Sequence, residues 1–104
     1  MYMYFAVVKL SFEATTDSSQ YRKDLRQLTE KIRARFKVCA AACNDDPEGT
    51  AIAITALGSS EERLSHTLDA IVEFCETSGY GRILSEQTLL DHLDALADFA
   101  EAAD

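Results

Sequence analysis

The sequence predicts an α+β protein with a ferredoxin-like fold, in which the elements follow the order βαββαβ and one further helix ends the chain. Three observations predict it. Two segments with the apolar periodicity of helices alternate with short segments rich in β-branched, aromatic or small residues. A turn-forming "DDPEG" at 45–49 separates two of the short segments and indicates a hairpin. Two right-handed crossovers would then place both helices on one side of a four-stranded antiparallel sheet.

The first strand is predicted at 4–12, "YFAVVKLSF", which contains neither Gly nor Pro. Side chains alternate across a strand, so one face of this strand is wholly apolar and carries Tyr4, Ala6, Val8, Leu10 and Phe12. The other face is mixed and carries Phe5, Val7, Lys9 and Ser11.

The first helix is predicted to follow the polar segment "TTDSSQ", in which Asp17, Ser18 and Ser19 are candidate N-cap residues. Its apolar residues recur at intervals of three and four, as one narrow stripe at 3.6 residues per turn does. They are Tyr21, Leu25, Leu28, Ile32 and Phe36.

The next elements follow in order. Two strands are predicted in "KVCAAACN" and "TAIAITAL", on either side of the turn. Ser59 and Glu62 have capping-box spacing and predict the start of a second helix. Its inner stripe is Leu64, Leu68, Ile71 and Cys75. Gly79 is its predicted C-cap, and "RIL" is a short last strand.

The C-terminal segment is predicted to be an acidic amphipathic helix over 86–104, with Ser85 as a candidate cap. Its leucines and alanines fall on one side and its acids on the other, and it contains no Lys or Arg. The sequence thus divides into a ferredoxin-like domain at 1–85 and an added helix at 86–104.

Composition limits the classes of function. The 104 residues make one domain, and their net charge of −8 disfavours DNA and anionic membranes as partners. No apolar run approaches the ~20 residues that span a bilayer. Three cysteines without a secretory signal indicate reduced thiols and a cytoplasmic protein.

The positive charge is concentrated on the first helix. Residues 22–37 sum to +5, so the rest of the chain sums to −13. At 100° per residue, four cations fall within about 60° of one flank. They are Arg22, Arg26, Arg33 and Lys37, called the basic strip below. Lys31 and Arg35 fall on the opposite flank.

Two interpretations of the basic strip remain open. It is a solvated face that pairs locally with acids of the second helix, namely Glu61, Glu62, Asp69, Glu73 and Glu76. Alternatively, it is a partner-binding site for an acidic protein or for structured RNA, since cations at intervals can follow phosphates. No aromatic residues are interleaved with the strip to stack on bases.

The sheet face away from the helices is expected to be too apolar for water. Phe5 and Val7 would lie there beside small Ala, Cys and Thr residues of the middle strands. A homodimer or the docked C-terminal helix would cover this face, and ferredoxin-like sheets often pair in this way.

Catalytic, cofactor and metal sites are not indicated. Cys39 and Cys43 would lie ~13 Å apart along one strand, too far for a disulfide or a shared metal. His66 and His92 have no second ligand beyond Glu62 at helical spacing, and four glycines leave no phosphate-cradling loop. The sequence favours a protein that is not an enzyme and needs no cofactor, with a sensor or enzyme on the sheet face as the lowest-ranked alternative.

The segments "LRQLTEKIRARFKVCAA", "LDAIVEFCE" and "ILSE" resemble the YlxP-like family of small bacterial ferredoxin-like proteins of unassigned function. In that family a basic helix runs into an Arg-Phe-Asn-Val strand start. Where the family's helix begins Ser-Leu-Lys-Glu-Lys-Arg, this chain retains Ser19, Arg22 and Lys23. The family's aromatic hairpin segment is replaced by "NDDPEGT". The resemblance implies the fold and no particular reaction.

Overall fold

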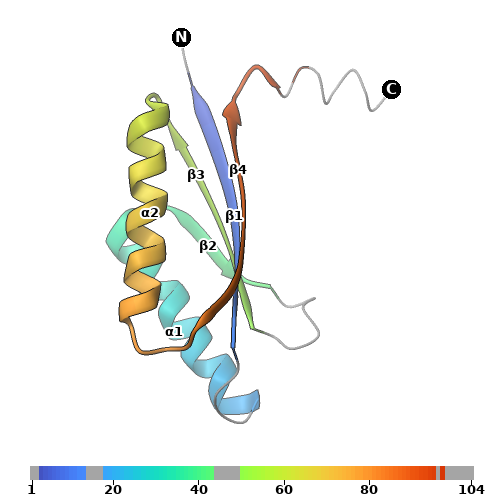
Figure 1. Cartoon of the computed structure of the whole chain (residues 1–104), viewed down its shortest axis with the longest axis vertical. Helices are drawn as coiled ribbons and strands as arrows, with labels where there is room; N and C mark the ends of the chain where they lie inside the picture. Colours follow the sequence, from blue (N-terminus) through green and yellow to red (C-terminus); the bar gives the residue numbers. More distant parts are fainter. Residues whose placement is uncertain (1–2, 14–17, 44–49, 96, 98–104) are drawn as a thin grey trace.

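The computed structural model describes residues 3–13, 18–43, 50–95 and 97. Its elements are β1 (Tyr4–Phe12), α1 (Ser18–Phe36), β2 (Cys39–Ala42), β3 (Ala51–Gly58), α2 (Glu61–Thr77) and β4 (Ile83–His92). The strands form one sheet in the order β2-β3-β1-β4, and every neighbouring pair is antiparallel. Both helices cover the same face of the sheet (Figure 1). The predicted ferredoxin-like architecture is therefore confirmed.

The core lies between the helices and the sheet face that they cover. Alternate residues of β1 point into it, and Ala6, Leu10 and Phe12 are fully buried there. The predicted stripes of both helices meet this layer, and they are buried except for the half-buried Phe36. The apolar face of β1 and the apolar stripes of the helices, both predicted from the sequence, therefore pack against each other as the two sides of one core.

Tyrosines fix the beginning of α1 against the sheet. The Tyr21 hydroxyl donates to the carbonyl oxygen of Glu13 at 3.0 Å, and the Tyr80 hydroxyl donates to the carbonyl oxygen of Tyr21 at 2.7 Å. The rings of Tyr21 and Phe12 both pack against Tyr80. Burial raises the pKa of both tyrosines, so each hydroxyl stays a donor further into alkaline pH than an exposed tyrosine would. These contacts set where the first turns of α1, and hence Arg22, lie.

The ends of the helices differ in detail from the prediction. Lys37 follows α1 with φ of 53°, and its N–H donates to the carbonyl oxygen of Arg33 at 3.2 Å, which together make the left-handed C-terminal motif. The N-cap of α2 is Ser60, one residue later than predicted, and its hydroxyl accepts from the N–H of Arg63. Gly79 adopts a φ of 74° after α2, as expected for a residue that ends a helix.

The predicted C-terminal helix is wrong for residues 86–92, which belong to β4. The short strand expected at "RIL" is a ten-residue strand, and the expected boundary between residues 85 and 86 falls inside it. Adjacent Leu89 and Leu90 pair with Val7 and Ala6 of β1 and so point to opposite faces of the sheet. The long free edge of β1 needs a partner, and this tertiary pairing overrides the local helical pattern. The last residues of the expected helix, 98–104, lie outside the described residues.

Candidate functional site: the basic strip and the open face of the sheet

The basic strip lies on the flank of α1 that faces the edge strand β2. Arg22, Arg26, Arg33 and Lys37 are all exposed. The Arg33 guanidinium donates to the carbonyl oxygen of Ala40 in β2 at 3.2 Å, which fixes the direction of this flank. Arg22 and Arg26 lie on the same flank of the continuous helix, one turn apart.

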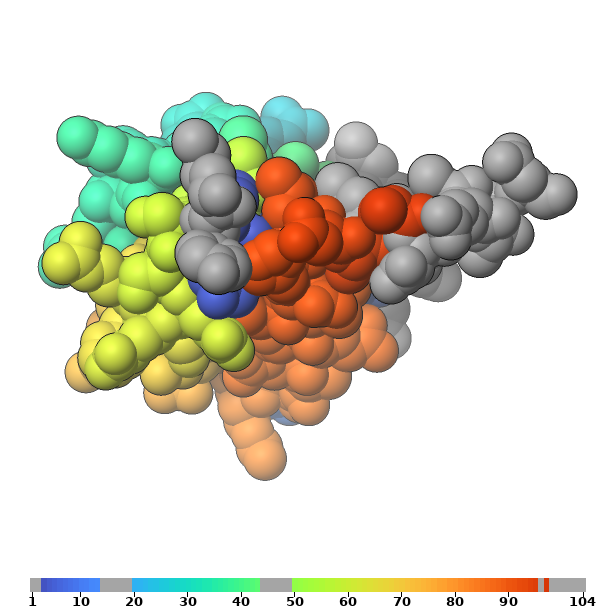
Figure 2. Space-filling view, turned by 90° about the horizontal axis from the view of Figure 1, so that it is seen from above, coloured from blue at the N-terminus to red at the C-terminus, as the bar shows by residue number. Residues whose placement is uncertain are grey.

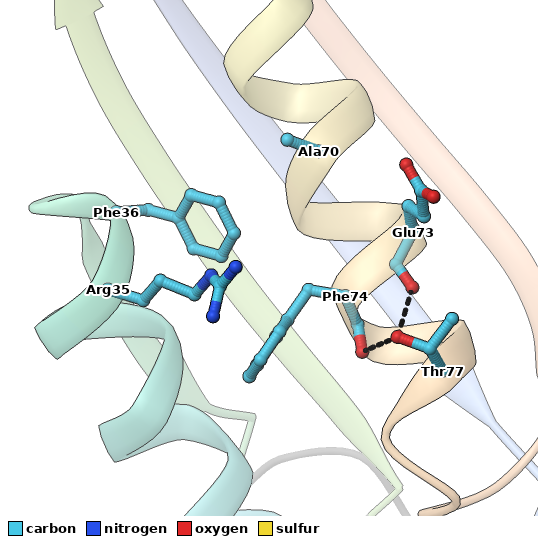
Figure 3. Close-up of a pocket in the computed structure, with 6 residues that line it drawn as sticks. All are labelled: Arg35, Phe36, Ala70, Glu73, Phe74 and Thr77. Atoms are coloured by element: carbon cyan, nitrogen blue, oxygen red, sulfur yellow. Dashed lines mark hydrogen bonds between the residues drawn. The ribbon is translucent and has the colours of Figure 1, made fainter.

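The opposite flank of α1 meets α2. The Arg35 guanidinium carbon lies 5.2 Å from the centre of the Phe74 ring of α2 and 5.8 Å from that of Phe36. The two rings are in edge contact, 5.7 Å apart. In Figure 3, the Arg35 guanidinium lies between Phe36 and Phe74. Arg33 and Arg35 are two residues and ~200° apart on the helix, so the strip is turned away from α2.

A groove of about 270 Å³ separates the helices at this point. Its lining residues are Arg35, Phe36, Ala70, Glu73, Phe74 and Thr77. The Thr77 hydroxyl is already used, since it donates to the carbonyl oxygens of Glu73 and Phe74 (Figure 3). The sequence assigned Arg35 only to a flank, because its stacking on Phe74 depends on how the helices pack.

The pairing of the strip with acids of α2, which one of the two interpretations expects, is absent from the described part of the chain. Within residues 3–13, 18–43, 50–95 and 97, no ion pair joins any of the four strip cations to a carboxylate. The strip faces away from α2, so Glu73 and its acidic neighbours are on the wrong side of α1. Arg22 and Arg26 are left without a hydrogen bond or ion pair to the described part of the chain.

The four strip residues therefore differ in their surroundings. Arg33 is tied to Ala40 and stabilises the junction of α1 with β2. Lys37 lies one residue beyond the helix, in the left-handed conformation. Of the four strip residues, Arg22 and Arg26 combine exposure and helical geometry with no partner among the described residues, so they are best placed to contact another molecule.

The second candidate surface is the face of the sheet opposite the helices, called the open face below. Side chains on it line up in rows across the strands. The central row is Cys39, Thr55, Val7 and Leu89; on one side lies the row Leu57, Phe5 and Asp91, and on the other the row Ala41, Ala53, Lys9 and Gln87. Val7, Leu57 and Leu89 are 44%, 68% and 49% exposed. Leu89 was missed by sequence reasoning because its segment was predicted to be helical.

The open face is hollowed where its side chains are small. A shallow depression of about 230 Å³ lies over β2 and β3, lined by Val7, Cys39, Ala40, Ala41, Ala53, Ile54 and Thr55. The Thr55 hydroxyl donates to the carbonyl oxygen of Ala6 at 3.1 Å. Cys39 is the sole titratable group in this lining. Among the described residues, its lining holds no convergent acid, base and nucleophile.

The two edge strands of the sheet, β4 and β2, differ in whether their outward backbone groups are covered. The backbone N–H of Leu93 donates to the carbonyl oxygen of Met3, so these two residues form a hydrogen-bonded pair. Such pairs occur at every second residue of an antiparallel ladder, so the backbone groups of Asp91, Leu89 and Gln87 bond to β1. The backbone groups of the residues between them, Glu86, Thr88 and Leu90, point outward from the sheet edge. The N–H of His92 also faces outward, and it donates to the Asp91 carboxylate at 2.7 Å. In Figure 2, β4, orange to red, is exposed on the side of the molecule away from the helices. The short edge strand β2 is instead covered by Arg33 at Ala40.

The cysteines are in contrasting environments. Cys75 is fully buried on the inner stripe of α2, and burial raises the pKa of its thiol to about 11. Cys39 is exposed on the open face. In the described portion of the chain, no three His, Cys, Asp or Glu side chains gather as metal ligands would, and no helix is long and apolar enough to cross a membrane.

Comparison with known proteins supports the fold. A family model described as "Protein of unknown function (DUF503)" matches residues 5–88, from β1 into β4. No curated protein matches the sequence.

The solved structures with a similar fold include the following two. One is a dimeric protein of unknown function and ferredoxin-like fold from Bacteroides fragilis NCTC 9343, with a TM-score of 0.55 and 10% identity over 88% of this chain and 96% of that chain. The other is a de novo designed protein with a ferredoxin fold, with a TM-score of 0.51 and 14% identity over 89% of this chain and 86% of that chain. At these identities the likeness shows the fold alone.

Proposed function

We propose that this chain, which belongs to the DUF503 family of proteins of unknown function, is a small non-enzymatic binding module that works as a cytoplasmic homodimer. Its basic strip contacts an anionic partner. Within the family we place the chain with the YlxP-like proteins, on the basic helix that runs into β2.

The orientation and isolation of Arg22 and Arg26 carry this proposal. Two like charges one helical turn apart cost a helix about 0.2–0.5 kcal/mol. In the described structure, neither arginine forms an ion pair with a carboxylate that would offset this cost. An anionic partner would offset it, and the chain's −13 outside residues 22–37 would steer such a partner toward the one cationic segment.

Structured RNA is a second candidate partner. Cations one helical turn, or about 6 Å, apart can follow a phosphate backbone. Aromatic residues do not interleave the strip, which argues against single-stranded RNA because its bases are bound by stacking. An acidic protein surface would use the same arginines without a requirement for regular phosphates.

Homodimerisation draws on two observations. The open face exposes Val7, Leu57 and Leu89 together, and contiguous apolar surface of this kind usually marks an interface. The similar protein from Bacteroides fragilis is described as dimeric, which is an analogy of fold. A sensor or enzyme on the open face ranks lowest, because the depression there is shallow and almost wholly apolar.

The test compares two charge-reversal variants of α1. Arg22→Glu/Arg26→Glu reverses the strip, and Lys23→Glu/Lys31→Glu makes the same charge change on exposed residues of the same helix outside it. The probes are a 20-base-pair double-stranded RNA and polyglutamate, each titrated at 50 and 200 mM salt.

The proposal expects wild type and the control pair to bind one of the probes, and the strip pair to bind it at least tenfold more weakly. Binding of the RNA probe with a steep loss between the two salt concentrations would identify a nucleic-acid partner. Equal binding by the two variants would show that the strip is ordinary solvated surface. No binding of either probe at 50 mM salt would refute the proposal.

A further inference from the structure

We infer that a second copy of this chain packs on the open face about a two-fold axis that crosses the strands at the central row, through Val7. The inference rests on the proposed homodimer and names the surface that forms it. Three properties of the open face carry it: its relief, its charges and its size.

The relief of the open face is self-complementary. Leu57 is 68% exposed and lies in the row on one side of Val7, whereas Ala53 lies in the row on the other side, in the lining of the depression. A two-fold axis through the central row turns each outer row of one copy over the opposite outer row of its partner. Leu57 of each copy then faces the small Ala53 of the other, and Val7 faces Val7.

The charges of the open face are also self-complementary. Lys9 and Asp91 are the only charged residues of the three rows, they have opposite signs, and they lie in opposite outer rows. The axis places Lys9 of one copy over Phe5 of the partner, one strand spacing or ~4.8 Å from the partner's Asp91. A face with two charges of one sign in these two rows would repel its own copy.

The size of the face allows a small dimer interface. Four strands ~4.8 Å apart and three residue rows ~6.8 Å apart give about 400 Å² of planar area per copy. The relief of the side chains adds to this area, and a standard interface buries roughly 800 Å² per partner. The same packing would cover Val7, Leu57 and Leu89 together.

The first experiment measures mass by sedimentation equilibrium over a wide concentration range. Wild type is expected at about twice the chain mass of 11.5 kDa. Leu89→Lys, in the central row, is expected to shift the dimer dissociation constant at least a hundredfold toward monomer. Leu84→Lys is the matched control on the same strand, since Leu84 is 57% exposed and lies outside the three rows. It should remain dimeric.

A charge swap distinguishes facing copies from a general loss of stability. Lys9→Asp places an acid one strand spacing from the partner's Asp91 and should weaken the dimer about tenfold or more. Lys9→Asp/Asp91→Lys restores the opposite signs and should recover most of that loss, although the same Asp91 change removes the acceptor of the His92 N–H. No recovery in the double variant would refute the proposed axis.

Other outcomes would assign the face elsewhere. The wild type could instead be monomeric, with an open face that becomes accessible to reagents or causes aggregation only after deletion of residues 98–104. That result would make the chain's own C-terminal segment the occupant of the face and refute the dimer. A dimer lost in Thr88→Pro and kept in Leu89→Lys would mean pairing at the outer edge of β4 instead. The strip variant Arg22→Glu/Arg26→Glu should stay dimeric, so failure of the face and failure of the strip are separate results.

Discussion

The guanidinium of Arg33 donates a 3.2 Å hydrogen bond to the carbonyl oxygen of Ala40 and ties the C-terminal half of α1 to the free edge of β2. Cys43 donates to Ala51 in the same ladder, so odd-numbered residues of β2 bond to β3 and Ala40 turns its backbone groups outward. An unpaired edge carbonyl invites pairing with another chain. Arg33 occupies it, so this member of the basic strip has a structural role that Arg22 and Arg26 lack.

Arg33→Ala should therefore destabilise the fold, and Arg22→Ala should not. Loss of one charge-assisted hydrogen bond at a partly exposed site is expected to cost about 1 kcal/mol of unfolding free energy. Arg22→Ala removes the same charge from the same helix without a hydrogen bond and should stay within about 0.5 kcal/mol of wild type. Urea unfolding measures both. Equal midpoints for the two variants would contradict a structural role for Arg33.

Lys37→Gly should stabilise the protein. Lys37 holds a φ of 53°, where an L residue with a Cβ is strained by about 1–2 kcal/mol. Glycine removes the strain and loses some of that gain to its greater freedom in the unfolded chain, so a net gain of about 0.5–1 kcal/mol is expected.

Lys37→Ala is the control for charge, because it removes the ammonium group and keeps the Cβ. Thermal unfolding should rank glycine above wild type and alanine near it. If alanine and glycine raise the melting temperature equally, the strain at residue 37 is not the cause.

The sequence predicts best what is decided locally. The stripe from Tyr21 to Phe36 and the alternation from Tyr4 to Phe12 are each complete within one segment, and the structure has α1 and β1 there. Residues 86–92 failed because their leucines also satisfy a helical period, and only the long free edge of β1 selects a strand. Such a pairing is between residues far apart in the sequence and leaves little trace in local pattern.

The same division applies to the candidate site. Helical geometry alone puts Arg22, Arg26 and Arg33 on one flank, which needs no tertiary information. Which neighbour that flank meets depends on the packing of α1 over the sheet. One of the two interpretations drawn from the sequence paired it with α2, which is rich in acids, whereas the Arg33 contact directs the flank to β2. Leu57 and Leu89 were likewise not identified, since the rows of the open face exist only once strand registers are set.

The buried thiol of Cys75 should make stability fall at alkaline pH. Its pKa is raised from 9.0 to about 11 in the fold by burial, with a smaller effect from Glu76. The unfolded chain releases the proton at the lower pKa, so the contribution of Cys75 is constant below pH 9 and is lost as pH rises from 9 to about 11. Two pKa units correspond to about 2–3 kcal/mol.

Cys75→Ala supplies the comparison. It removes the thiol, so its unfolding free energy should decline less than that of wild type between pH 9 and 11, whatever its value at pH 7. In native protein at pH 8, a thiol reagent should label the exposed Cys39 and reach Cys75 only on unfolding. Parallel pH profiles for the two proteins would show that Cys75 does not carry this dependence.

The ladder of β4 predicts opposite effects of proline at neighbouring positions. The N–H of Leu89 bonds to Val7 inside the sheet, whereas the N–H of Thr88 points away from β1. Proline lacks this donor and is tolerated where a strand's N–H faces solvent.

Leu89→Pro leaves a β1 carbonyl unpaired and should cost roughly 2–3 kcal/mol more unfolding free energy than Leu89→Ala. Thr88→Pro should lie within about 1 kcal/mol of Thr88→Ala, which equally lacks the hydroxyl that donates to Glu86. Denaturant unfolding of all four variants measures the two differences. Equal Pro-versus-Ala differences in unfolding free energy at residues 88 and 89 would mean that β4 pairs with β1 in a different register from the one that the Leu93 to Met3 bond implies. The backbone groups of Glu86, Thr88 and Leu90 would then not be the ones that point outward.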